Sequence, residues 1–143
     1  KGHTEVVRLL IGGAAAVNQA RTDNGTTPLY TAVLHDHTKV ASLLIGSSAG
    51  VNQALTDTGS TPLLIAAEKG RTEVVNLLIS SGAAVNQATI DNGVTPLFFA
   101  AGQGHTEVVS LLISNGAAVN QEEVDYGATP LHAAACNGHT EVV

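Results

Sequence analysis

The sequence predicts an all-α solenoid of stacked helix-turn-helix units that carry hairpin-like fingers. Thr-Pro-Leu recurs at Thr27, Thr61, Thr95 and Thr129, and each step between neighbouring copies is 34 residues. Leu-Leu-Ile and Val-Asn-Gln blocks recur at the same step. Several motifs at one fixed period are the signature of a repeat architecture. Aromatic residues make up only 3% of the chain, with no Trp or Met, so Ala, Val, Leu and Ile must form a thin core between helices.

The first helix of each unit is expected to begin at the Thr-Pro-Leu motif. In the repeat 91–124, Thr95 stands at an N-cap position and Pro96 at the first helical position, where its missing N–H costs nothing. Leu97, Ala100 and Ala101 follow at the spacing of one helical face. Gly104 is expected to end this helix.

A second helix is expected from about Thr106, with Val108 and Leu112 facing inward. Gly116 fits a left-handed C-terminal cap. The segment that leads to the next Thr-Pro-Leu contains an Asp-Asn-Gly-type turn and predicts the finger.

Such short helices cannot hide their apolar faces alone, so the units must stack. We therefore expect Leu63, Leu97 and Leu131 to occupy equivalent buried places in successive layers.

The chain begins and stops at the same phase of the repeat. Residues 2–7 and 138–143 are both Gly-His-Thr-Glu-Val-Val. We expect one domain, 1–143, that consists of a partial repeat at 1–22, full repeats at 23–56, 57–90 and 91–124, and a partial repeat at 125–143.

The motifs together resemble the ankyrin repeat. The resemblance is carried by Thr-Pro-Leu-His-Ala-Ala at 129–134, Gly-His-Thr-Glu-Val-Val at 104–109, Leu-Leu-Ile and Gly-Ala-Ala-Val-Asn, and it covers essentially the whole chain. It implies an L-shaped stack in which fingers and first helices line a concave face. This chain is a 34-residue variant of a repeat that usually has about 33 residues, and the additional residue should lengthen each finger.

Three non-glycine residues stand at positions where other repeats have Gly. Ala14 and Ser48 replace the glycine of Gly82 and Gly116, and Asp36 replaces another. Each of these residues lowers the stability of the fold by on the order of 1 kcal/mol if its backbone is forced into the left-handed region. We expect the repeat 23–56 to be the loosest full repeat.

Two histidine groups have spacings that could suit a metal. They are His132, Cys136 and His139, and the pair His35 and His37. A simpler interpretation is that His132 completes Thr-Pro-Leu-His and that His139 caps or packs at the next helix. No metal or other cofactor is expected.

Acidic residues gather in the last finger, at Glu122, Glu123 and Asp125. A catalytic carboxylate pair needs a sheltered cleft, so a solvated acidic patch is expected at this open tip. No nucleophile triad or phosphate loop accompanies these acids, and we expect no enzymatic activity. An asparagine in each unit is expected to form a ladder between neighbouring turns (Asn18, Asn52, Asn86 and Asn120).

Composition limits the partners. The net charge is −6, and all six Lys and Arg lie before residue 72, so the second half lacks the basic stripe that nucleic acid requires. No apolar run approaches the roughly 18 residues that span a membrane. A single cysteine, Cys136, favours an intracellular, cytoplasmic setting.

The predicted function is a protein-interaction module that binds a partner protein through the concave face. We expect Ile65, Val94 and Phe99 to form an apolar stripe that faces solvent, although Ile65 and Phe99 could instead pack between helices. The nine candidate contact residues are Leu34, His35, Ile65, Lys69, Asn92, Val94, Phe99, Gln103 and Tyr126. The alternative is a scaffold segment of a longer array, with end-to-end self-association through its uncapped terminal repeats.

Overall fold

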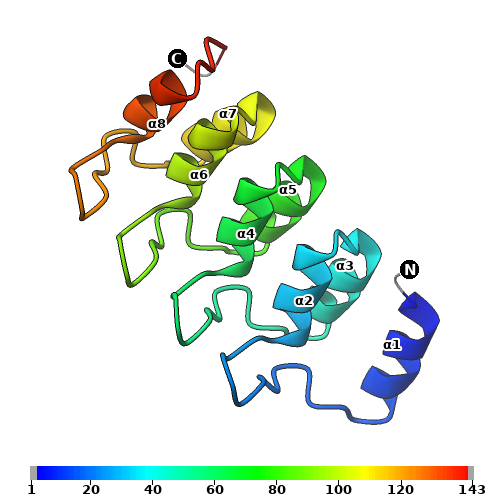
Figure 1. Cartoon of the computed structure of the whole chain (residues 1–143). Helices are drawn as coiled ribbons and strands as arrows, with labels where there is room; N and C mark the ends of the chain where they lie inside the picture. The colour runs from blue at the N-terminus through cyan, green and yellow to red at the C-terminus, as the bar shows by residue number, and fades with distance from the viewer. Residues whose placement is uncertain (1–2, 142–143) are drawn as a thin grey trace.

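The computed structural model describes residues 3–141 and places two layers of helices side by side (Figure 1). This part of the chain contains α-helices and no β-strand. The inner layer is α2 (Pro28–Leu34), α4 (Pro62–Glu68), α6 (Pro96–Gln103) and α8 (Pro130–Cys136). The outer layer is α1 (Thr4–Gly12), α3 (Thr38–Gly46), α5 (Thr72–Ser80) and α7 (Thr106–Ser114). The connections between units project as fingers beneath the inner helices, so the predicted all-α solenoid is confirmed.

Each inner helix begins as its sequence predicts. The Thr95 side chain accepts a hydrogen bond from the N–H of Phe98 at 3.2 Å, and Pro96 is the first helical residue. The same cap occurs at Thr27, Thr61 and Thr129. These caps satisfy a backbone donor that the helix itself leaves unpaired, so every unit starts its helix at the same residue.

The helices end at left-handed residues. Gly104, which follows α6, has φ 73°, and Gly116, shortly after α7, has φ 86°. The three non-glycine residues at equivalent positions also adopt positive φ, with 63° at Ala14, 58° at Asp36 and 69° at Ser48. The stack therefore imposes one backbone path on every unit, whichever residue stands at the turn.

A continuous apolar core fills the space between the two layers. Leu29, Leu63 and Leu97 lie in it at equivalent positions of the inner helices. Small residues such as Ala66 allow the neighbouring helices to approach closely. The predicted burial is wrong for Leu131, which is 55% exposed on α8, because no further outer helix covers it among residues 3–141.

Polar links also join each unit to the next. Asn52 donates its amide to the carbonyl of Gly82 at 3.2 Å and accepts from the N–H of Ala84 at 2.8 Å. Asn18 and Asn86 make the same pair of bonds one unit away. The predicted ladder is confirmed at these three asparagines, and it fixes the distance between successive turns. Of the two partial repeats, residues 1–2 and 142–143 lie outside the described part of the chain.

Candidate protein-interaction surface

We use the term inner face for the surface formed by the fingers and the exposed parts of the inner helices. Seven of the nine candidate contact residues are largely or partly exposed: Leu34, His35, Lys69, Asn92, Phe99, Gln103 and Tyr126. Leu34, His35, Lys69 and Gln103 lie at the ends of the inner helices α2, α4 and α6, whereas Asn92 and Tyr126 lie in the turns of fingers.

Two candidates do not face solvent. Ile65 is 7% exposed and belongs to the core, and Val94 is 5% exposed. The N–H of Thr89 donates to the carbonyl of Val94 at 3.0 Å, and the N–H of Val94 donates to the Thr89 hydroxyl. Val94 therefore closes the base of a finger. The prediction of a solvent-facing stripe through Ile65 and Val94 is wrong, because stacking covers both side chains.

Phe99 and Tyr126 differ sharply in exposure. Phe99 is half-buried on α6, so packing accounts for only part of its side chain. Tyr126 is 93% exposed at the tip of the last finger. Tyr126 is thus the most prominent aromatic side chain on the inner face.

The last finger is held by a buried carboxylate. Glu123 is 8% exposed, and its two oxygens accept hydrogen bonds from the N–H groups of Asp125 (2.8 Å), Tyr126 (2.8 Å) and Ala128 (3.0 Å). The expectation of a solvated patch is wrong for Glu123, because the turn places three donors around it.

These hydrogen bonds, led by that from Ala128, lower the pKa of Glu123 although its burial opposes the shift. Glu123 stands two residues before Asp125, the aspartate of its turn. Thr89 stands at the equivalent position before Asp91, and its hydroxyl also accepts a hydrogen bond from the finger backbone. A carboxylate at this position was therefore the sequence signal for the acceptor role.

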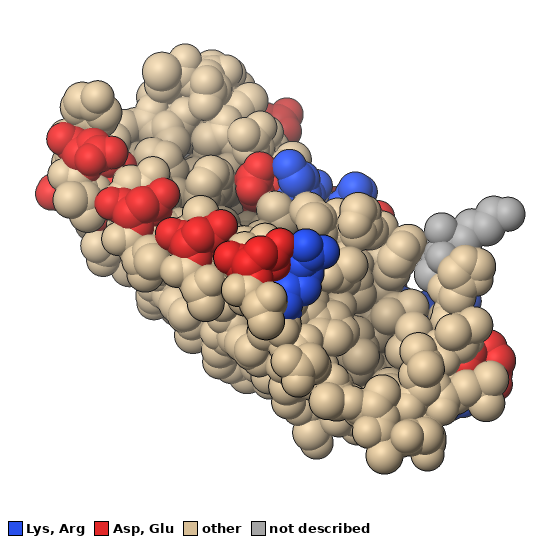
Figure 2. Space-filling view, turned by 60° about the horizontal axis from the view of Figure 1, so that its bottom comes forward, with Lys and Arg blue, Asp and Glu red and all other residues tan. Residues whose placement is uncertain are grey.

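An acidic row runs along the finger tips. It contains one exposed aspartate per finger (Asp23, Asp57, Asp91 and Asp125). Figure 2 shows this row of red side chains along one edge of the stack, ending beside a blue basic one. Arg21 pairs with Asp23 at 2.6 Å and lowers the pKa of that carboxyl to about 2. The Asp23 carboxylate is therefore ionised at neutral pH.

Charged and imidazole groups line the ends of the inner helices. Lys69 pairs with Glu68 at 3.0 Å, and Arg71 pairs with Asp36 of the preceding unit at 3.1 Å. The rings of His35 and His37 have centroids 6.1 Å apart. The ends of the inner helices therefore carry charges of both signs.

Two of the histidines considered as metal ligands, His132 and His139, form hydrogen bonds within the stack. His132 completes a capping box, in which its Nδ1 accepts from the N–H of Thr129 at 3.2 Å. His139 places Nε2 at 3.0 Å from the carbonyl oxygen of Gly102. Within residues 3–141, no group of three or more His, Cys, Asp or Glu side chains could hold a metal ion.

His105 stands at the N-cap position of α7, but its side chain makes no capping hydrogen bond to that helix. Its Nε2 lies 3.0 Å from the carbonyl oxygen of Glu68, in the preceding unit. His105 and His139 therefore each link their own repeat to the preceding one. The spacing of histidines in the sequence did not reveal this role.

Comparisons with known proteins agree with this architecture. A family model of ankyrin repeats (three copies) matches residues 1–89 and 85–143, which together cover the chain. The comparison with curated proteins gives no match. No helix in the described part of the chain is both long and apolar enough to cross a membrane.

Proposed function

Because the chain belongs to the ankyrin repeat family, whose repeats generally serve as protein-interaction modules, we propose that it binds a partner protein through its concave, inner face. The observation that carries this proposal is that Tyr126 is exposed on a finger whose backbone is held in place by hydrogen bonds. Its side chain is 93% exposed, while three backbone N–H groups of its finger are held by Glu123. An aromatic side chain on a preorganised loop loses little entropy on binding, and tyrosine is enriched among residues that dominate interfaces.

The contact extends from Tyr126 to the other exposed candidates. Phe99 supplies a half-buried apolar surface, and Leu34 exposes an aliphatic side chain at the end of α2. Asn92 and Gln103 supply polar contacts around them. Ile65 and Val94 support this surface from below instead of touching the partner.

The partner segment is expected to be cationic where it meets the fingers. Four exposed aspartates follow one another there, and the chain has no Lys or Arg after Arg71. Complementary charge raises the association rate and orients the partner. The same acidic row disfavours nucleic acid as the partner.

Binding without catalysis fits the family, which is typically non-enzymatic. We propose that residues 1–143 act as one such module in an intracellular setting, without a cofactor.

The test uses a partner captured by the intact protein and confirmed by direct binding measurements. Replacement of Tyr126 or Phe99 by Ala should raise the dissociation constant about tenfold or more, the effect of losing a dominant contact. Ser110→Ala, at an exposed position of the outer helix α7, is the control and should leave affinity unchanged. Circular dichroism must show an intact fold in each variant. Unchanged affinity in both aromatic variants would reject the inner face as the binding surface.

A further inference from the structure

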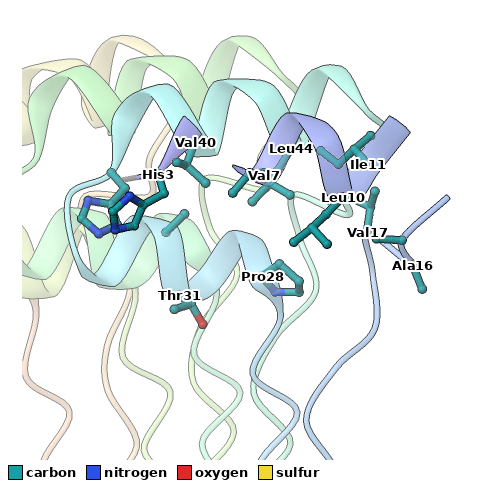
Figure 3. Close-up of a pocket in the computed structure, with 13 residues that line it drawn as sticks. His3, Val7, Leu10, Ile11, Ala16, Val17, Pro28, Thr31, Val40 and Leu44 are labelled. Carbon is teal, nitrogen blue, oxygen red and sulfur yellow. The ribbon is translucent and has the colours of Figure 1, made fainter. Parts of the chain in front are cut away.

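Two large apolar side chains are exposed on neighbouring fingers. Ile90 is 69% exposed and Val124 is 73% exposed, one repeat of 34 residues apart. Ile90 remains exposed although another finger, 123–128, follows it in the stack. The apolar groove of about 410 Å³ beside α1 (Figure 3) is different, because α1 has no inner helix of its own unit among residues 3–141. The exposure of Ile90 therefore does not depend on a missing neighbour.

The packing role of this finger position requires only one methyl group. Cγ2 of Ile90 lies over the turn of the preceding finger, where a Cβ added at Gly59 would be 2.7 Å from it. Thr56 stands at the equivalent position one repeat earlier, and its Cγ2 lies over Gly25 in the same way, at 2.8 Å. Threonine therefore supplies the contact that the stack needs. The remainder of the Ile90 side chain is additional apolar surface in solvent.

The two apolar side chains lie on adjoining fingers that contact each other. Ile90 begins the turn 90–93, and the ends of such a turn lie within about 7 Å of each other. Cγ2 of Val124 lies beside the other end of this turn, where a Cβ added at Gly93 would be 2.8 Å from it. The N–H of Val124 also donates to the carbonyl of Asn92 at 2.8 Å. We use the term finger patch for the surface formed by Ile90 and Val124.

Acids without an ion-pair partner border the finger patch. Asp91 and Asp125 directly follow the two patch residues, are exposed, and form no ion pair among residues 3–141. The N–H of Asn92 donates to the Asp91 carboxylate at 2.8 Å and is the main cause that lowers the pKa of Asp91. In the first finger, by contrast, Arg21 pairs with Asp23 at 2.6 Å. The negative charge beside the finger patch is thus left for a partner to balance.

The fingers therefore differ in two features at once. The residue before the turn aspartate is threonine in the first two fingers and a branched apolar residue in the last two (Thr22, Thr56, Ile90 and Val124). The chain also has no Lys or Arg after Arg71. Exposed apolar surface marks interaction sites, and complementary charge selects and orients the partner. A partner segment that is both apolar and cationic fits these two fingers.

We propose that the finger patch holds an extended segment of the partner protein, with two apolar residues three positions apart and Lys or Arg beside them. The apolar residues cover Ile90 and Val124, and the basic residues lie against Asp91 and Asp125. This inference rests on the proposed function, because the finger patch is part of the inner face.

The spacing of the units sets the spacing along the segment. Helices that pack side by side lie about 8–10 Å apart, so equivalent side chains of neighbouring units recur at about that distance. A polyproline II segment rises about 3.1 Å per residue with three residues per turn, so its residues i and i+3 share one side and lie about 9 Å apart. A β-strand would turn the same two residues to opposite faces. The polyproline II conformation therefore matches both the apolar and the acidic positions of the fingers.

The test begins with peptides selected on the intact chain. Short random peptides displayed on phage are enriched for binding, and the enriched sequences are synthesised and their dissociation constants measured by fluorescence anisotropy. The peptides should share two apolar residues three positions apart with Lys or Arg beside them. A selection that yields no binder, or binders without basic residues, would overturn the proposal.

The apolar contribution is tested by the double variant Ile90→Thr, Val124→Thr. It installs the residue of the first two fingers, so the contact between fingers is kept. The dissociation constant of the peptides should rise about tenfold or more, because less apolar surface is covered on binding. Ile113→Thr makes the same exchange at a 47% exposed position of the outer helix α7 and should leave affinity unchanged. Equal affinity of the double variant and the unaltered chain would reject the finger patch.

The charge contribution is tested by the double variant Asp91→Asn, Asp125→Asn, which keeps a side-chain oxygen at each turn. The dissociation constant should rise about fivefold or more at low salt, and its dependence on salt should weaken. Asp23→Asn, in the first finger, is the control and should leave both quantities unchanged. A salt dependence that is the same in the double variant would reject a cationic segment.

The outcomes separate this inference from the proposed function. Weaker peptide binding after Phe99→Ala or Tyr126→Ala, with no effect of the two threonine substitutions, would keep the inner face and reject the finger patch. No effect of any of these changes would reject both. Sedimentation of the pure chain provides a further check, since self-association that the threonine substitutions abolish would show that a second copy covers the patch and would overturn the proposal.

Discussion

The imidazole Nε2 of His105 lies 3.0 Å from the carbonyl oxygen of Glu68, in the preceding repeat. A carbonyl oxygen can only accept, so Nε2 carries the proton and donates it. The ring also packs over Gly70, where a Cβ would lie 2.6 Å from Nδ1 of His105 and where φ is 66°. One histidine therefore couples the outer helix of one unit to the inner helix of another.

Replacement of His105 by Ala should lower the free energy of unfolding by about 1 kcal/mol, the usual net value of one such bond. Urea denaturation followed by circular dichroism measures the change. His35→Ala is the control, because His35 is exposed, and it should shift stability by less than about 0.5 kcal/mol. Equal effects of the two substitutions would contradict the inter-repeat role of His105.

Leu10 and Leu78 occupy equivalent positions in their repeats, but their replacement by Ala should change the free energy of unfolding by very different amounts. Leu78→Ala removes a side chain that is fully buried and should lower the free energy of unfolding by about 2–5 kcal/mol. Leu10 stands at the equivalent position two repeats earlier but is largely exposed, so Leu10→Ala should cost less than about 0.5 kcal/mol. The comparison is made by urea denaturation of the two variants and the unaltered chain. Similar losses would show that Leu10 is already covered.

The left-handed turn after each outer helix should prefer glycine. Ser48 has φ 69°, and Ser48→Gly should raise the free energy of unfolding by roughly 0.5–1 kcal/mol as backbone strain is relieved. Gly82→Ser is the matched reverse change, because a Cβ at Gly82 meets nothing within 4 Å, and it should destabilise by a similar amount. Thermal unfolding of both variants tests the prediction, and it fails if the two shifts have the same sign.

Glu123 should make stability depend on pH. Its pKa lies below the ordinary value of 4.5 because three backbone N–H groups, that of Ala128 first, hold the charged form. The unfolded chain therefore binds this proton more readily than the folded chain. The stabilisation is present above pH about 4.5 and is lost as pH falls through the lowered pKa.

Glu123→Gln isolates this contribution from those of the other acids. The difference in unfolding free energy between the unaltered chain and Glu123→Gln should be largest at neutral pH and should shrink toward zero in acid, where the unaltered side chain is also neutral. Urea denaturation at a series of pH values measures it. A difference that stays constant with pH would rule out the charged form as the acceptor in the finger.

Much of the fold could be predicted because its determinants are local. The cap at Thr95, the proline after it and the left-handed glycines act within a few residues, so the repeat motif alone marked where the helices start and end. The candidate site was predicted less well. Ile65 and Val94 were placed by position on an exposed stripe, yet both are covered once neighbouring units stack.

The sequence by itself determined the repeat length, the helix pairs and the residues that turn the chain between them. The tertiary structure alone decided which copies of a motif are buried, since Leu10 and Leu44 occupy the same place in the repeat and differ only in having an inner helix against them. It also assigned the carbonyl partner of His105. The physical reason is that backbone propensity acts over a few neighbouring residues, whereas burial and inter-repeat hydrogen bonds depend on groups about one repeat away.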